Sequence, residues 1–229
     1  MSQLSSSLLS EKQRLRIQTR HKVAIQNYGY QPQALFWSSR EIQEVRFRVL
    51  VQILAKDDKL NPSQKQLSPP SLLDVGCGFG DLSRYLQHQE IEVNYYGLDL
   101  SQDMVDSARC QNPHLDFKQG DIFDLKFDQQ VFDYVFLSGA LNEVVESPED
   151  AEFQGKGAYA KAVIQEMYRV CKKGVAFNLL DARNQWVQSR IDLQSFQPQE
   201  IIEFCQSFAK QVTWQDDYLE NDFTVFLGK

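Results

Sequence analysis

The stretch that most constrains the fold of this chain runs from Leu72 to Ser83 and reads LLDVGCGFGDLS. Apolar residues lead into Asp74, three glycines follow at alternate positions, and a helix-compatible run comes next. This order predicts a buried strand, a tight turn and a helix start. Because glycine has no Cβ, a ligand can lie against the backbone of Gly76, Gly78 and Gly80, and the helix N-terminus adds free N–H groups. Asp74 can order the turn or face a cationic part of the ligand.

The residues around this turn also indicate which ligand it binds. A dinucleotide-binding turn has the pattern G-x-G-x-x-G, and Asp81 stands at the position of its third glycine. A carboxylate there would repel a pyrophosphate. A second predicted strand, Val93–Leu98, is followed by Asp99, roughly 20 residues past the turn, where an acidic residue suits a ribose diol. A ribose, no pyrophosphate and room for a cation together favour S-adenosyl-L-methionine (SAM).

Four segments resemble, in order, the successive motifs of the class I SAM-dependent methyltransferases: LLDVGCGFGDLS, YGLDLS, QGDIF and FDYVFLSGALN. The resemblance covers about Pro70 to Lys229 and implies an α/β fold. Its Rossmann-like sheet would have seven strands, mostly parallel with a reversed last strand. Two further segments, Pro32–Phe47 and Ser147–Tyr159, resemble a bacterial branch of these enzymes whose acceptors are mostly undefined.

The resemblance implies roles for the residues at the first two strand tips. Asp74 and the three glycines would approach the amino-acid part and the ribose of SAM. Asp99 would accept hydrogen bonds from both ribose hydroxyls, because charge-assisted bonds are the stronger kind. Leu100 and Met104 would contact the adenine or the ribose, although ordinary helix packing explains Met104 nearly as well.

The next two strand tips carry further candidates. Asp121 would accept a hydrogen bond from the adenine amino group, and the N–H of Ile122 would serve a ring nitrogen. A turn or capping role is the alternative for Asp121. The backbone carbonyls of Ser138 and Gly139 would hold the methionine amino group.

Two amphipathic helical patterns precede the glycine-rich stretch, one from Ser10 to about Asn27 and one from Arg40 to Leu54. A polar, proline-containing linker, Lys56–Pro70, follows them. We therefore expect residues 1–66 to form an N-terminal helical extension or lid and residues 67–229 to form the methyltransferase domain.

The aromatic loop Tyr28–Trp37 between the two helices has two readings. It could pin the helices to the core, or it could close over the cofactor and the acceptor. On the second reading Trp37 contacts the cofactor. Arg40 could pair with the methionine carboxylate of SAM, since a guanidinium fork matches a carboxylate, or be a helix-surface residue.

Charge and composition exclude several classes of partner. Residues 1–66 carry 11 Lys and Arg against 5 Asp and Glu, whereas the rest carries 13 against 26. An acidic main domain argues against nucleic acid as a partner. No apolar run approaches the ~20 residues of a membrane span. Four scattered cysteines without a C-x-x-C pair predict no metal site and a cytoplasmic protein with reduced thiols. We expect a monomer or a homodimer, the latter through the N-terminal helices.

The sequence after the fourth strand, SGALNEV, narrows the acceptor. It lacks the [ND]-P-P-[YF] motif of enzymes that methylate planar exocyclic nitrogens, and no Pro-Cys pair supplies a thiolate for cytosine. A small molecule with an oxygen, nitrogen or sulfur acceptor is the leading expectation. Methyl transfer by in-line displacement mainly requires alignment, so no catalytic residue is evident. Asn142, Glu143 and Tyr28 are the weak candidates for orienting or deprotonating an acceptor.

Three other functions remain open from the sequence. A SAM-binding regulator or scaffold that no longer transfers methyl would bind the cofactor tightly without turnover. A nicotinamide oxidoreductase is disfavoured by Asp81. Aminopropyl transfer from decarboxylated SAM shares the fold but usually needs an additional acidic pair, which the sequence does not reveal.

Overall fold

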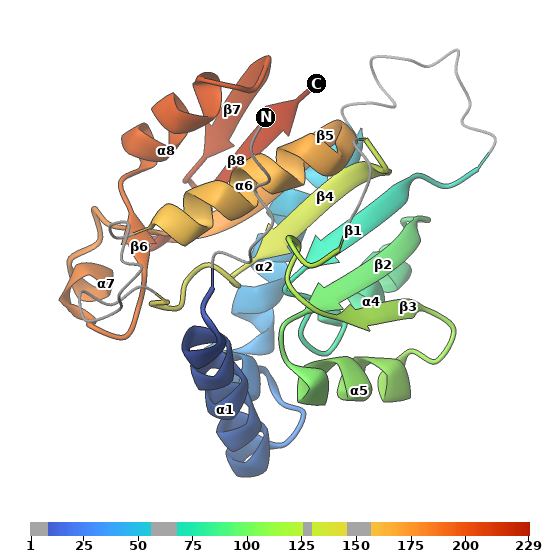
Figure 1. Ribbon diagram of the computed structural model, residues 1–229. Helices are drawn as coiled ribbons and strands as arrows, with labels where there is room; N and C mark the ends of the chain where they lie inside the picture. The colour runs from blue at the N-terminus through green and yellow to red at the C-terminus, as the bar shows by residue number, and fades with distance from the viewer. Residues whose placement is uncertain (1–8, 56–67, 126–129, 146–156) are drawn as a thin grey trace.

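The computed structural model describes residues 9–55, 68–125, 130–145 and 157–229. A central sheet with the order β3-β2-β1-β4-β5-β8-β7 forms its middle layer (Figure 1). The strands are β1 Ser71–Val75, β2 Asn94–Asp99, β3 Asp116–Gln119, β4 Phe132–Ser138, β5 Cys171–Asp181, β6 Ser195–Phe196, β7 Gln211–Gln215 and β8 Asp222–Gly228. The helices are α1 Glu11–Tyr28, α2 Arg40–Leu50, α4 Asp81–His88, α5 Gln102–Gln111, α6 Ala158–Val170, α7 Gln185–Ser189 and α8 Pro198–Gln206, with a short 3₁₀ helix at Pro32–Leu35.

Strands β1 to β5 pair in parallel, and β8 runs antiparallel to both β5 and β7. This arrangement confirms the predicted mostly parallel sheet with a reversed last strand. The seven predicted strands form the main path, and the two-residue strand β6 adds an eighth beside β5. Neither β6 nor the five-residue helix α7 was predicted, because elements this short show no hydrophobic period.

Helices cover both faces of the sheet, as alternation of strands and helices requires. One core packs α6 and α8, through Ile164, Met167 and Ile201, against one face of the central strands. The other core packs α2, α4 and α5 against the opposite face, through Leu50, Leu82 and Val105 among others. The strands are therefore buried on both sides, which accounts for their continuous apolar runs.

Helix α1 begins where the sequence predicts, with Ser10 as its N-cap. The backbone N–H of Gln13 donates to the Ser10 hydroxyl and the Gln13 side chain accepts from the Ser10 N–H, which is a complete capping box. Ser39 caps α2 in the same way, through the N–H of Ile42. The predicted linker and the segment Ser147–Tyr159 lie largely outside the described residues.

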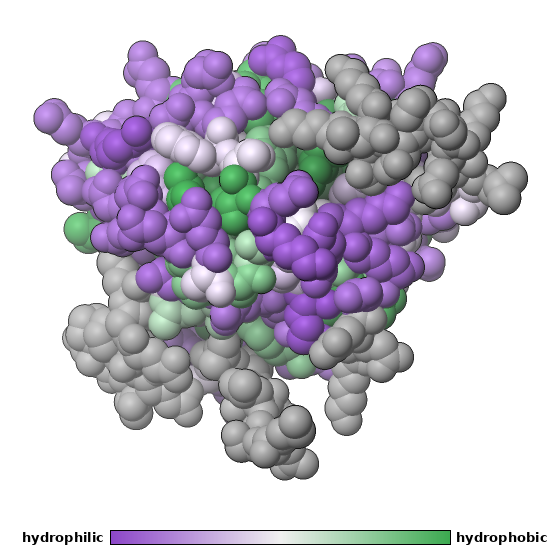
Figure 2. All heavy atoms as spheres, turned by 90° about the horizontal axis from the view of Figure 1, so that it is seen from above, coloured by the Kyte–Doolittle hydropathy of each residue, from purple (hydrophilic) through white to green (hydrophobic). Residues whose placement is uncertain are grey.

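The face seen in Figure 2 is mostly hydrophilic, with hydrophobic side chains gathered near its middle. Within the described residues, no helix is both long enough and apolar enough to cross a membrane.

Candidate functional site

The carboxyl ends of the parallel strands meet at one edge of the sheet, and the arrowheads of β1, β2 and β3 point towards the side on which α1 lies (Figure 1). Two segments form the base of the site there, Asp74–Gly80 after β1 and Leu98–Ser101 after β2, and we call them the floor. Main-chain bonds join them, because the N–H groups of Gly76 and Cys77 donate to the carbonyl of Leu98 at 2.7 and 3.0 Å. The floor is thus set by backbone geometry.

Gly78 has a positive φ of +53°, a conformation that favours glycine. A Cβ at this position would lie 2.8 Å from Cδ2 of Leu35 in the 3₁₀ helix. At the tip of β4, a Cβ on Gly139 would lie 2.6 Å from the ring of Trp37. The aromatic loop therefore sits directly on two of the predicted cofactor-binding glycines.

Two buried carboxylates belong to the floor. Asp99 accepts from the N–H of Gly78 and from the N–H of Ser101, both at 2.9 Å, which leaves further lone pairs for a ligand. Asp74 accepts from the hydroxyl of Tyr95 at 2.5 Å. Burial raises the pKa of Asp74 to about 7, against the opposing hydrogen bond from Tyr95 and with help from the negative charge of Asp99. A cation beside Asp74 would favour the ionised form of its carboxyl group.

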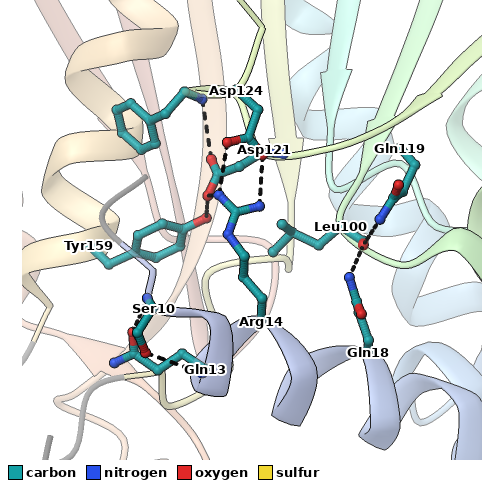
Figure 3. Close-up of polar contacts among 10 residues, drawn as sticks. Ser10, Gln13, Arg14, Gln18, Leu100, Gln119, Asp121, Asp124 and Tyr159 are labelled. Atoms are coloured by element: carbon teal, nitrogen blue, oxygen red, sulfur yellow. Dashed lines mark hydrogen bonds and ion pairs between the residues drawn. The ribbon is translucent and has the colours of Figure 1, made fainter. Parts of the chain in front are cut away.

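Helix α1 lies across these strand ends, and we call it the cover. Figure 3 shows Arg14 of the cover between two carboxylates, with Asp124 at 2.7 and 3.0 Å and Asp121 at 3.5 Å. The hydroxyl of Tyr159 donates to Asp121 at 3.1 Å. Burial raises the pKa of Asp121, although Arg14 opposes the shift. The predicted adenine-binding carboxylate is thus already paired with the cover.

The cover also bonds to carbonyls of the strand tips. Gln18 donates to the carbonyl of Leu100 at 3.0 Å, beside a 3.2 Å bond from Gln119 to the same oxygen (Figure 3). Gln13 donates to the carbonyl of Val145 at 3.1 Å. Side chains from one helix therefore reach the ends of β2, β3 and β4.

Floor, cover and aromatic loop together enclose a cavity of about 260 Å³. Ten of the thirteen predicted cofactor-binding residues line it: Trp37, Asp74, Gly76, Gly78, Asp99, Leu100, Asp121, Ile122, Ser138 and Gly139. The catalytic candidates Asn142 and Glu143 also line it. The sequence thus brings distant motifs to one place.

Four predicted site residues lie outside the cavity lining. Gly80 contributes the N-cap of α4, and Met104 is buried in a small core with Phe79 and Ala24. Arg40 contacts Asp81 at 2.9 Å. Tyr28 is 54% exposed. Roles for these residues in binding or catalysis stay predictions.

The loop after β4 is held in place by Asn142. Its Oδ1 accepts from the N–H of Leu180 at 3.3 Å, and its carbonyl accepts from the N–H of Gln194 at 2.9 Å. Glu143 next to it faces the cover, with Arg20 at 3.1 Å and His21 at 3.6 Å. The pKa of Glu143 lies below its ordinary value, because His21 and Arg20 together outweigh burial.

The cavity lining also includes residues that the sequence did not single out, among them His21, Arg46 and Trp186. Arg46 pairs with buried Asp222 and stacks 4.3 Å from the centre of the Trp37 ring. A signal for His21 was present, because it follows the buried Ile17 by four residues and precedes the buried Ala24 by three. It therefore lies on the inward stripe of an amphipathic helix.

These residues fit SAM on their own chemistry. Asp99 offers its remaining lone pairs to ribose hydroxyls. Asp74 offers a carboxylate to a cation.

Comparison with known proteins agrees with this chemistry. A family model described as a methyltransferase domain matches residues 73–179. A Mycobacterium tuberculosis protein named as a methyltransferase is 28% identical over 165 residues, which cover 70% of this chain and 94% of that protein. The malonyl-[acyl-carrier protein] O-methyltransferase of Salmonella typhimurium is 33% identical over 143 residues, and the match covers 58% of this chain and about half, 51%, of that enzyme.

Among solved structures, the fold is similar to magnesium protoporphyrin IX methyltransferase of Synechocystis, whose crystal structure contains bound SAM. The TM-score is 0.56 at 16% identity, and the alignment covers 82% of this chain and 79% of that one. The ordered motifs, the strand order and these likenesses agree. Residues 73–179 match a methyltransferase domain, and these findings together support a class I SAM-dependent methyltransferase.

Proposed function

We propose that this protein transfers a methyl group from SAM to a small-molecule acceptor by in-line displacement within the covered cavity. The observation that carries the proposal is the enclosure itself: α1 lies over the strand ends and Trp37 lies on Gly139, so the space suits a small molecule better than a polymer. When bound, SAM supplies a methyl carbon that its sulfonium has already activated.

The residues of the chain then act mainly by binding and alignment. Asp99 would hold the ribose, Asp74 the cationic amino-acid part and Asp121 the adenine, so that the methyl group faces the rest of the cavity. Residues 1–66 would act as a lid on the domain of residues 67–229. Holding donor and acceptor in line is the largest contribution such a site can make.

The names of the similar proteins support a small acceptor group. The Salmonella relative is named for malonyl-[acyl-carrier protein] and the Synechocystis neighbour for a porphyrin. We propose no specific acceptor from these names. We also propose a cytoplasmic protein acting as a monomer or homodimer, in keeping with four free cysteines.

The first test is a calorimetric titration with SAM, S-adenosylhomocysteine (SAH) and NADH in parallel. We expect binding of the two sulfur ligands and none of NADH. Acceptor compounds are then screened by release of SAH. Binding of NADH alone would overturn the proposal, and tight SAM binding without turnover on any acceptor would favour a silent SAM-binding regulator or scaffold.

A further inference from the structure

Of the three histidines in the sequence, all within the described residues, only His21 lines the cavity. His88 is exposed at the end of α4, and His114 is exposed in a turn. The side chain of His21 is 18% exposed, and its ring lies 5.8 Å from that of Phe36, another residue of the cavity wall. A single imidazole is therefore placed at the site.

The two ring nitrogens of His21 have different surroundings. Nε2 lies 3.6 Å from Oε2 of Glu143, whereas Nδ1 is buried and has no hydrogen-bond partner among the described residues. The carboxylate favours a proton on Nε2, so Nδ1 keeps the lone pair. A buried nitrogen without a partner is costly and calls for an explanation.

The charges around His21 make it a stronger base. Burial lowers its pKa, but contact with Glu143 and the negative charge of Asp99 outweigh burial and the opposing charge of Arg20, and the pKa lies above its ordinary value. These groups come from three elements packed around the ring: the loop after β4, the end of β2 and α1 itself. A base that titrates near the working pH is the most effective.

We propose that His21 is the general base of the methyl transfer, positioned by Glu143, and that the acceptor is a hydroxyl compound. This inference rests on the proposed function and names the acceptor class for it. A carboxylate is ionised at neutral pH and needs no base, and an amine in its neutral form attacks through a lone pair that it already has. A hydroxyl oxygen must lose its proton as it attacks, and a partnerless imidazole nitrogen meets that need.

The step balances with SAM as the only co-reactant. A bond forms between the hydroxyl oxygen and the methyl carbon, and the carbon–sulfur bond breaks with its electron pair kept by sulfur. The hydroxyl proton passes to Nδ1 of His21. The products are the methyl ether, SAH and an imidazolium whose charge faces Glu143.

If His21 only packs in the cavity wall, its replacement should leave kcat close to that of the wild type. The first experiment follows the histidines by NMR titration of the full chain bound to SAH, with His21 assigned from its absence in His21→Gln. We expect a His21 midpoint above 6.5 that falls in Glu143→Gln. A His21 midpoint that does not respond to Glu143→Gln would overturn the pairing.

The second experiment measures SAH release at saturating SAM with phenol and benzyl alcohol, against benzoic acid and benzylamine. We expect turnover with a hydroxyl compound, and a kcat in His21→Gln that is lower by about 10²–10⁴-fold, the usual contribution of general-base catalysis. The acid limb of the wild-type rate should follow the NMR midpoint and move to lower pH in Glu143→Gln. The exposed control His88→Gln should keep the wild-type kcat.

Two results would overturn the role of His21 or the acceptor class: a kcat in His21→Gln within tenfold of wild type, or no release of SAH with either hydroxyl compound. Calorimetry separates this failure from failure of the proposed function. If SAM binds and benzoic acid or benzylamine is methylated, only the present inference fails. If SAM does not bind, the proposed function fails.

Discussion

The floor and the cover of the cavity are held by different kinds of interaction. Main-chain bonds from Gly76 and Cys77 to Leu98 join the two parts of the floor, and its carboxylate Asp99 is 6% exposed. The polar contacts of the cover come from long side chains, beside the packing of Ala24 with Phe79 and Met104, and the Arg14–Asp124 pair leaves 20% and 39% of its two side chains exposed. Partly exposed ion pairs contribute little, so the cover should open while the floor stays folded.

Helix α2 follows the cover in sequence, and we expect it to unfold only together with the sheet. Arg46 and Asp222 form an ion pair with 5% and 0% of their side chains exposed. Replacing Asp222 with Asn leaves a buried guanidinium without a counter-ion, and we expect a loss of about 3–5 kcal/mol in the free energy of unfolding. Urea denaturation measures it.

The double variant Arg46→Met/Asp222→Asn is the control for this prediction, because it removes both charges and should recover most of the stability. A loss below about 1 kcal/mol in Asp222→Asn would mean that the pair behaves like a surface pair. Helix α2 would then have to be counted with the cover and not with the sheet.

The next largest effect should come from the floor. Asp99→Ala removes the expected ribose acceptor, and we predict SAM binding weaker by roughly 1.5–3 kcal/mol, or about 10- to 150-fold in Kd. Calorimetry measures the change. Asp103→Ala, at an exposed carboxylate in the first turn of α5, is the matched control and should bind SAM as the wild type does. An unchanged Kd in Asp99→Ala would remove Asp99 from the ribose site.

The floor was readable from the sequence because its signals are local. A strand, a glycine turn and a capped helix follow each other within Leu72–Ser83, and each signal rests on the backbone preferences of a few neighbouring residues. The same is true of the N-cap Ser10. The structure confirms these elements with ends shifted by only a few residues.

The parts of the cavity lining that come from the cover and from α7 were harder to predict, because they depend on contacts between segments that are distant in the sequence. Arg14 and Asp121 are 107 positions apart, and no local pattern pairs them. The five-residue helix that carries Trp186 is too short for a hydrophobic period. The predicted ligand contact of Arg40 stays a prediction, and in the structure its side chain contacts Asp81.

Asp74 should make both folding and SAM binding depend on pH. Its pKa of about 7 lies above the ordinary 3.8, so this group favours folding fully below pH 3.8 and the contribution is lost as pH rises to 7. A bound cation favours the ionised form, so SAM should bind about tenfold more tightly at pH 8 than at pH 6. Calorimetry in two buffers of different protonation enthalpy should show proton release at pH 6. In Asp74→Asn, which keeps an acceptor for Tyr95, this pH dependence should disappear.

We expect the smallest effect on stability from Arg14→Gln. This variant tests most directly whether the cover opens while the floor stays folded. Losing the contacts with Asp121 and Asp124 should lower the free energy of unfolding by less than about 1 kcal/mol, because the Arg14–Asp124 pair is partly exposed and the buried Asp121 lies 3.5 Å from Arg14 and keeps its hydrogen bond from Tyr159. Amide hydrogens of α1 should nevertheless exchange several-fold faster while those of β1 stay protected, and added salt should do the same to the wild type. Arg48→Gln, an exposed arginine on α2, should change neither. If α1 and β1 lose protection together in Arg14→Gln, cover and floor open as one unit, and closure of α1 over the cavity could not be a separate step in binding.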